Sequence, residues 1–144
     1  MLLKTIEELE KWMRDNCFNF DSYSVNGNFI HEGYGIENSG GLFMWYYTER
    51  GEKENLKCFA TETEAVIYAY NQITADKWAN AHCIGFTQNK EKSFELSSKL
   101  EEMNIPFFQD EIPYYGEKLP VYRTFVSGCD IKRVTDLKAK YYMY

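Results

Sequence analysis

The sequence predicts an α+β fold, in which an antiparallel meander with flanking helices is followed by a β-α-β-β-α half. Two observations predict it. Amphipathic stretches begin at capping-box residues, and short aromatic or apolar runs are bounded by glycine-containing turns. At 144 residues the chain is long enough for a single domain (1–144), or for two subdomains that cover 1–75 and 76–144.

The N-terminal stretch predicts a helix and then a turn. Thr5 can act as the N-cap with Glu8 as its capping-box partner, and apolar residues recur at helical spacing as far as Asn16. The dipeptide Asn26–Gly27 predicts a tight turn, because both residues accept a positive φ.

A meander of three strands is expected next. Strands are predicted over 34–37 and 42–48, joined by a glycine-rich turn, and the polar run 49–55 leads into a third strand at 56–60. The strand over 42–48 is apolar on both faces, with Leu42, Met44 and Tyr46 on one and Phe43, Trp45 and Tyr47 on the other. It is therefore either a central strand or a strand with one face covered by a partner.

The remaining residues predict the β-α-β-β-α half. A second capping box, Thr61 with Glu64, opens a helix that runs to Ile73. The elements expected after it are a strand at 83–86, a helix over 90–103, an edge strand at 105–108 containing Pro106, an irregular loop over 110–120, a strand at 121–126 and a last helix capped by Asp130.

Charge is concentrated in the first half of the chain. The 22 acidic and 16 basic residues give a net charge of −6, and residues 1–75 hold 12 of the acidic but only 6 of the basic ones. A negative surface argues against a nucleic-acid partner, whose phosphates attract basic patches. It favours a basic protein partner instead.

Nothing in the sequence predicts a metal site, a cofactor or a membrane span. The four cysteines, Cys17, Cys58, Cys83 and Cys129, are widely spaced and are expected to be buried thiols, and only two histidines accompany them. The glycine-rich segments match no nucleotide-binding motif. No stretch reaches the roughly 20 apolar residues of a membrane span, and no signal peptide is expected, so the predicted location is cytoplasmic.

A contact surface is predicted beside the ring-rich strand. The candidate residues are Tyr46 with Glu49, Glu52 and Glu54, which surround Arg50, and on the later loop Tyr114, Tyr115 and Glu117. Acidic groups would speed encounter with a basic protein, and aromatic rings would contribute desolvated contact area. The alternative explanation is that these residues form an ordinary solvated surface that contacts no partner.

An ordered set of segments resembles a small domain found among immunity proteins of bacterial polymorphic toxins and contact-dependent growth inhibition. The segments are Tyr23–Gly27, Tyr34–Glu37, Trp45–Gly51, Phe59 and Thr61–Ala65. The resemblance covers roughly the first half of the chain. It implies a small, often acidic, cytoplasmic protein without catalytic residues. Such a protein binds and neutralises a toxin made by the same cell or delivered by a sibling, in many cases a cationic nuclease.

Two functional hypotheses follow. The first is an immunity protein that is not an enzyme and that neutralises its cognate toxin by stoichiometric occlusion. The toxin is expected to be a cationic nuclease. The alternative is a small intracellular enzyme that uses Cys129 or His31, with Cys129 near a predicted helix N-terminus and His82 as a second histidine base. Substitution of Cys129 or His31 should abolish turnover by an enzyme and leave partner binding by an inhibitor intact. A nucleic-acid-binding module ranks last because of the negative charge.

Overall fold

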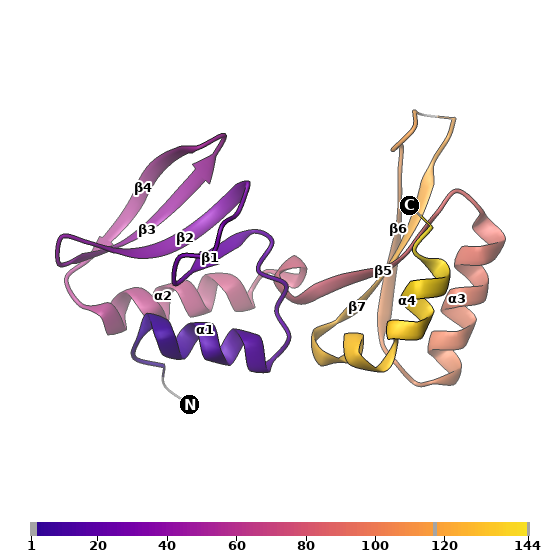
Figure 1. Ribbon diagram of the computed structural model, residues 1–144, viewed down its shortest axis with the longest axis horizontal. Coiled ribbons are helices and arrows are strands. Elements are labelled where there is room, and N and C mark those ends of the chain that lie inside the picture. Colours follow the sequence, from indigo (N-terminus) through magenta and orange to yellow (C-terminus); the bar gives the residue numbers. More distant parts are fainter. Residues whose placement is uncertain (1–2, 117, 144) are drawn as a thin grey trace. The chain divides into compact units, whose positions relative to one another are not determined.

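The computed structural model describes residues 3–116 and 118–143 and has the predicted α+β class (Figure 1). The chain forms two compact units, of which unit 1 ends at Ala79 and unit 2 begins at Asn80. This division falls four residues after the subdomain boundary considered from the sequence. Each unit has its own sheet, its own helices and its own hydrophobic core.

Unit 1 is built on a four-stranded sheet in the order β1-β2-β3-β4. Its elements are α1 (Ile6–Asp15), β1 (Tyr23–Val25), β2 (Glu32–Ser39), β3 (Leu42–Glu49), β4 (Glu52–Phe59) and α2 (Glu62–Thr74), and the 3-10 turn η1 (Lys77–Asn80) follows. Strands β2, β3 and β4 form the predicted antiparallel meander, and β3 is its central strand.

The predicted turn at Asn26–Gly27 is present, but it does not make a hairpin. Both residues have positive φ, of 68° and 90°, yet β1 pairs with β2 in parallel. The side chain of Asn28 explains the difference, because it accepts a hydrogen bond from the Val25 amide at 2.7 Å and donates one to the Tyr23 carbonyl at 2.9 Å. These bonds satisfy backbone groups of β1 without a hairpin partner. The chain then reverses direction again before β2 begins, so that β2 runs parallel to β1.

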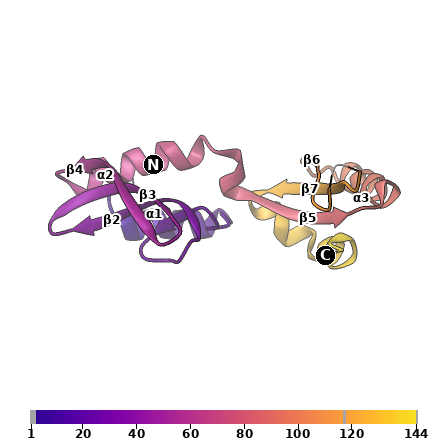
Figure 2. The same ribbon diagram turned by 90° about the horizontal axis from the view of Figure 1, so that it is seen from above.

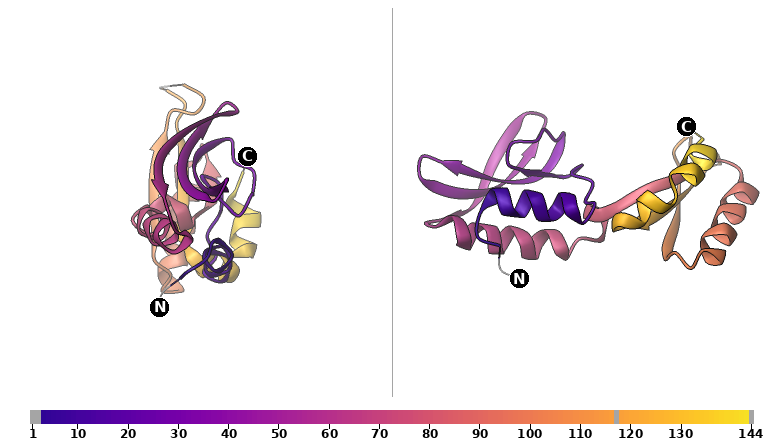
Figure 3. Two further views of the ribbon diagram at one scale, coloured as in Figure 1. Left: turned by 90° about the vertical axis from the view of Figure 1, so that its left-hand side faces the viewer. Right: turned by 60° about the horizontal axis from the view of Figure 1, so that its bottom comes forward.

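Helices α1 and α2 lie on the same face of the sheet (Figures 1 and 3). Both begin as predicted, since the Thr5 hydroxyl accepts from the Glu8 amide and the Thr61 hydroxyl accepts from the Glu64 amide. Their apolar sides bury Trp45 of β3, whose ring meets the Tyr68 ring of α2 edge-on at 5.8 Å. The core of unit 1 therefore lies between these two helices and one face of the sheet.

A bulge in β4 decides which of its side chains reach this core. The register between β3 and β4 shifts between Trp45 and Tyr46, so that β4 contains one extra residue, Leu56. Phe59 consequently packs against the core, whereas Cys58 faces outward and is exposed. The expectation of buried thiols is wrong for Cys58, which is exposed, and for Cys129, which is exposed and disulfide-bonded.

Unit 2 contains a three-stranded antiparallel sheet in the order β5-β7-β6. Its elements are β5 (Ala81–Thr87), α3 (Lys90–Glu102), β6 (Phe107–Ile112), β7 (Val121–Ser127), the 3-10 turn η2 (Gly128–Arg133) and α4 (Thr135–Tyr141). Figure 2 shows β5 and β7 running in opposite directions. Strand β6 follows Pro106 and lies at the edge, as predicted, although it extends to Ile112 and shortens the expected loop.

The predicted start of the last helix is wrong. Asp130 does not cap it but lies inside η2, where its carboxylate is 3.4 Å from the Arg133 guanidinium. Val134, with a non-helical backbone of φ −128° and ψ 22°, then separates η2 from α4. Val134 and Leu137 nevertheless lie in the core of unit 2, and Ile131 packs against it.

Candidate functional site

The predicted acidic loop is a hairpin. Strand β4 begins at Glu52, and only Arg50 and Gly51, with φ of 55° and 81°, connect it to β3. Two consecutive positive φ values are typical of the two-residue turns that suit the twist of paired strands. Glu49, Glu52 and Glu54 are therefore held on strands, and their directions are set by the sheet.

The hairpin register places the three predicted glutamates on one face. Glu49 is the cross-strand partner of Glu52, and Tyr47 is the partner of Glu54. Partners in an antiparallel pair project to the same side, and alternate residues of a strand do so too. The structure therefore brings Glu49, Glu52 and Glu54 together with Tyr47.

Tyr46 is separated from these glutamates and lies on the opposite face. Its side chain is only 5% exposed. It covers Gly35 of β2 so closely that a Cβ atom at Gly35 would lie 2.3 Å from the ring. The Lys53 ammonium lies 4.6 Å from the centre of the ring on the same face. Tyr46 is thus buried on the face of the sheet that is turned away from α1 and α2, and little of its surface is available to a protein partner.

Two further residues, both on β2, complete the surface that the sequence indicated only in part. Glu32 is the cross-strand partner of Glu49, and Tyr34 is the partner of Tyr47. A signal for them exists in the sequence, because a two-residue turn at Gly40–Gly41 determines the whole β2–β3 register. We call the set Glu32, Tyr34, Tyr47, Glu49, Glu52 and Glu54 the acidic face.

Hydrogen bonds organise the centre of the acidic face. The Tyr47 hydroxyl lies 2.7 Å from a Glu49 carboxylate oxygen and 2.9 Å from a Glu32 carboxylate oxygen. The bond to Glu49, followed by that to Glu32, raises the pKa of the Tyr47 phenol. One phenolic proton therefore serves two carboxylates, which leaves acceptor capacity directed at the solvent.

Aromatic stacking holds the rings of the acidic face in place. The Tyr34 ring is 38% exposed and stacks on the buried Trp45 at an interplanar angle of 7°. The Tyr47 ring meets Tyr34 edge-on at 5.2 Å. Behind them, Tyr23 of β1 donates a hydrogen bond of 2.7 Å to Asp76. The exposed ring of Tyr34 is thus fixed before any partner binds.

The carboxylates of the acidic face have no ion-pair partner in the described part of the chain. Glu32, Glu49 and Glu52 are direct neighbours across three strands, an arrangement in which like charges destabilise a sheet. Across residues 3–116 and 118–143, no lysine or arginine forms an ion pair with any of the four glutamates. Lys53, their nearest basic neighbour on β4, pairs instead with Glu37 on the other face at 2.8 Å.

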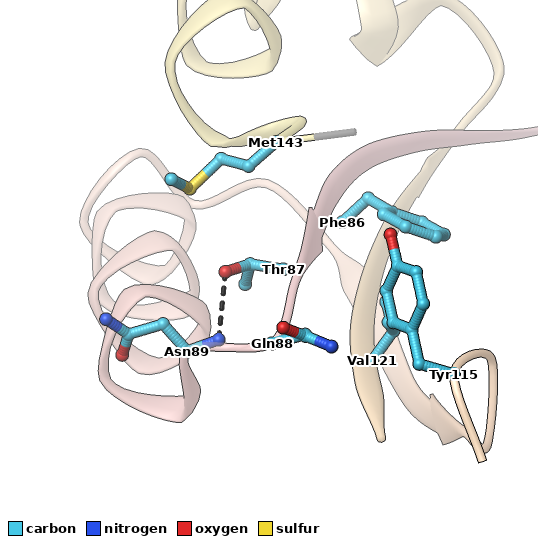
Figure 4. Close-up of a pocket in the computed structure, with 7 residues that line it drawn as sticks. All are labelled: Phe86, Thr87, Gln88, Asn89, Tyr115, Val121 and Met143. Atoms are coloured by element: carbon cyan, nitrogen blue, oxygen red, sulfur yellow. Dashed lines mark hydrogen bonds between the residues drawn. The ribbon is translucent and has the colours of Figure 1, made fainter. Parts of the chain in front are cut away.

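The second predicted contact region lies in unit 2, on the loop between β6 and β7. Tyr114 and Tyr115 are about half exposed, and their rings meet edge-on at 4.8 Å. Tyr115 also lines a pocket of about 260 Å³, with its ring directed toward Phe86 (Figure 4). Glu117 lies outside the described residues.

Of the residues of the alternative enzyme hypothesis, His31 lies in unit 1, whereas Cys129 and His82 both lie in unit 2. His31 precedes β2 in unit 1, and its ring meets Phe29 edge-on at 4.9 Å. Cys129 lies in η2 of unit 2 and is disulfide-bonded, so it offers no thiolate for nucleophilic attack. Cys83 is a half-buried free thiol in β5, and burial raises its pKa, which disfavours the nucleophilic thiolate.

Alkaline solution is expected to destabilise the fold through the buried Tyr23. Burial, followed by the hydrogen bond to Asp76, raises the pKa of Tyr23, so above about pH 10 the folded chain keeps a proton that the unfolded chain releases. The associated stability is complete below that pH and is lost as the pH rises. We expect the free energy of unfolding in urea to fall less steeply above about pH 10 in Tyr23→Phe than in the exposed control Tyr115→Phe. Identical pH profiles would contradict this.

Comparison with known proteins gives no relative: no protein-family model, no curated protein and no solved structure matches the chain. Within the described residues, no three histidine, cysteine or acidic side chains converge as metal ligands would. None of the helices in that part of the chain is long and apolar enough to cross a membrane.

Proposed function

We propose that this chain is an immunity protein, which binds a cognate bacterial toxin and neutralises it by stoichiometric occlusion. The observation that carries the proposal is the row of Glu32, Glu49 and Glu52, three adjacent carboxylates with no ion-pair partner among the described residues. Keeping like charges opposite one another costs stability. A basic partner would remove that cost on binding.

The chemistry of the acidic face matches a nucleic-acid-binding toxin. A nuclease holds its substrate with lysines and arginines that contact phosphates, and an acidic surface competes for the same groups. Tyr34 adds an exposed ring that is already immobilised on Trp45, so that contact with it costs little conformational entropy. Charge and preformed aromatic area together favour a cationic nuclease as the toxin.

The test is co-expression of the full chain with the product of the gene immediately upstream. The expected result is rescue of growth, together with a one-to-one complex and complete loss of nuclease activity at one molar equivalent. Failure to form a complex with a growth-inhibiting protein would overturn the proposal. Complete inhibition by far less than one equivalent would also overturn it, because it would require turnover and would favour the enzyme alternative.

Substitution of His31 separates the two functions further. We expect His31→Gln to leave growth rescue and the inhibition stoichiometry unchanged, because the imidazole lies outside the acidic face. The readout is the titration of nuclease activity with purified variant. Loss of rescue in a variant that still folds, as judged by circular dichroism, would favour the enzyme that uses His31.

A further inference from the structure

A groove lies on the face of unit 1 that is opposite to the acidic face. It has a volume of about 620 Å³, within the range of about 300–1,000 Å³ that is usual for small-molecule sites. Its walls are the segment between β1 and β2, which carries Phe29 and His31, and the hairpin turn that carries Arg50. Tyr46 and Lys53 also line it.

Arg50 supplies a cation to this groove. Glu49 and Glu52 flank the turn in sequence, but as cross-strand partners they project to the acidic face, whereas Arg50 lines the groove. In the described part of the chain, no carboxylate forms an ion pair or a hydrogen bond with its guanidinium. Such a guanidinium offers a planar fork that fits a carboxylate or a phosphate bidentately.

The remaining charged groups of the groove are arranged around this cation. The ammonium of Lys53 lies 2.8 Å from the Glu37 carboxylate, and this bond raises the pKa of Lys53. Because the charges of Lys53 and Glu37 offset each other, Arg50 gives the lining of the groove its net positive charge. His31 contributes a further hydrogen-bonding group to the lining.

An aromatic side chain at the rim of the groove is open to solvent. Phe29 is 78% exposed, and its ring meets the edge of the His31 ring at 4.9 Å. The neighbouring Ile30 is buried, so the segment is anchored while its phenyl ring stays open to the groove. A planar apolar ligand could pack on that ring.

The conformation of Arg50 is unfavourable for its residue type. Its φ of 55° is left-handed, and at the corresponding position of two-residue hairpin turns asparagine, aspartate and glycine are preferred. Strain of this kind persists where the side chain has a use. Here the strained position is also the one that delivers the guanidinium to the groove.

We propose that this groove binds a small anion, in which a carboxylate or phosphate is carried on a planar aromatic ring. The anion is held by Arg50 and the ring packs against Phe29. The proposal does not depend on the proposed function, since the acidic face and the groove lie on opposite sides of the sheet.

The experiment is a titration of the full chain with phenyl phosphate, in which binding is monitored through the amide chemical shifts in NMR spectra. We expect saturable shifts confined to residues 27–31 and 48–53. Binding should be at least about tenfold weaker for inorganic phosphate and for benzyl alcohol, each of which lacks one half of the ligand. If either one binds as tightly as phenyl phosphate, or if the shifts occur elsewhere or not at all, the proposal is overturned.

Two variants keep the test independent of folding. Arg50→Asn places a favoured residue in the turn, so its Tm should equal or exceed that of the wild type while phenyl phosphate affinity falls at least about tenfold. Phe29→Ser should remove the preference for phenyl phosphate over inorganic phosphate. The control Lys11→Asn removes an exposed cation of α1 and should bind as the wild type does. Unchanged affinity in Arg50→Asn would overturn the proposal.

Discussion

Reversal of Glu49, Glu52 and Glu54 to lysine is expected to slow association with the toxin by about 100-fold at low salt. Long-range attraction between complementary surfaces raises association rates by about 10- to 1,000-fold, and the variant replaces attraction with repulsion. Because the three side chains share one face of a hairpin, their charges act on the same part of the partner. Stopped-flow measurements of the association rate at several salt concentrations test this prediction. The association rate of the variant should also depend less on salt than that of the wild type.

A matched control separates the acidic face from net charge. The variant Glu91→Lys, Glu101→Lys, Glu102→Lys changes three exposed glutamates of α3 in unit 2, and both triple variants have a formal net charge of zero instead of −6. We expect the control to slow association by less than about tenfold, because its charges lie outside the acidic face. Equal slowing in both variants would make net charge the cause, and no slowing in either would place the interface elsewhere.

The hairpin reversal should not damage the fold. In the variant, Glu32 faces an ammonium group across the β2–β3 pair instead of the Glu49 carboxylate, so one like-charge pair of the sheet becomes an ion pair. We expect the Tm of this variant to equal or exceed that of the wild type. A large loss of thermal stability would show that the glutamates have a structural role.

Substitution of Gly33 by alanine is expected to lower the free energy of unfolding by about 3 kcal/mol or more. Gly33 has a φ of +146°, and a Cβ atom there would lie 2.0 Å from the carbonyl oxygen of Ser22. That oxygen cannot easily retreat, because it accepts a hydrogen bond of 2.9 Å from the Tyr34 amide. The change therefore combines backbone strain with a backbone clash, next to two residues of the acidic face.

Gly41→Ala provides the control for strain alone. Its φ is +93°, but a Cβ atom at this position would have no atom within 4 Å. We expect a loss of about 1 kcal/mol, the usual cost of a left-handed conformation in a residue with a side chain. Urea denaturation of both variants gives the comparison. If Gly41→Ala costs as much as Gly33→Ala, the contact with Ser22 contributes nothing.

Local signals in the sequence were sufficient for the order of the elements. Thr5 and Thr61 begin their helices as the capping boxes predicted, because capping depends on residues three positions apart. The parallel pairing of β1 was missed, since the side chain of Asn28 replaces the hairpin partner that Asn26–Gly27 normally indicates. The last helix starts later than predicted because the chain first forms η2 around Asp130.

The candidate site could be predicted only in part. Glu49, Glu52 and Glu54 were selected as a polar loop, and the two-residue turn at Arg50–Gly51 instead aligns them on one face. Glu32 and Tyr34 were missed because they join the site across strands and not along the chain. Tyr46 was placed among the contacts on composition, although strand alternation sends it to the other face.

The sequence by itself determined the α+β class, the starts of the helices that begin at Thr5 and Thr61 and the concentration of acidic residues in the first half, because each depends on residue type and short-range spacing. Only the tertiary structure decided which of those residues meet. A strand alternates its side chains with a period of two, so one turn residue or one bulged residue moves every later side chain to the opposite face. The turn at Arg50–Gly51 thereby gathered the carboxylates on one face and left Arg50 to line the groove on the other. The bulge at Leu56 then directed Phe59 to the core.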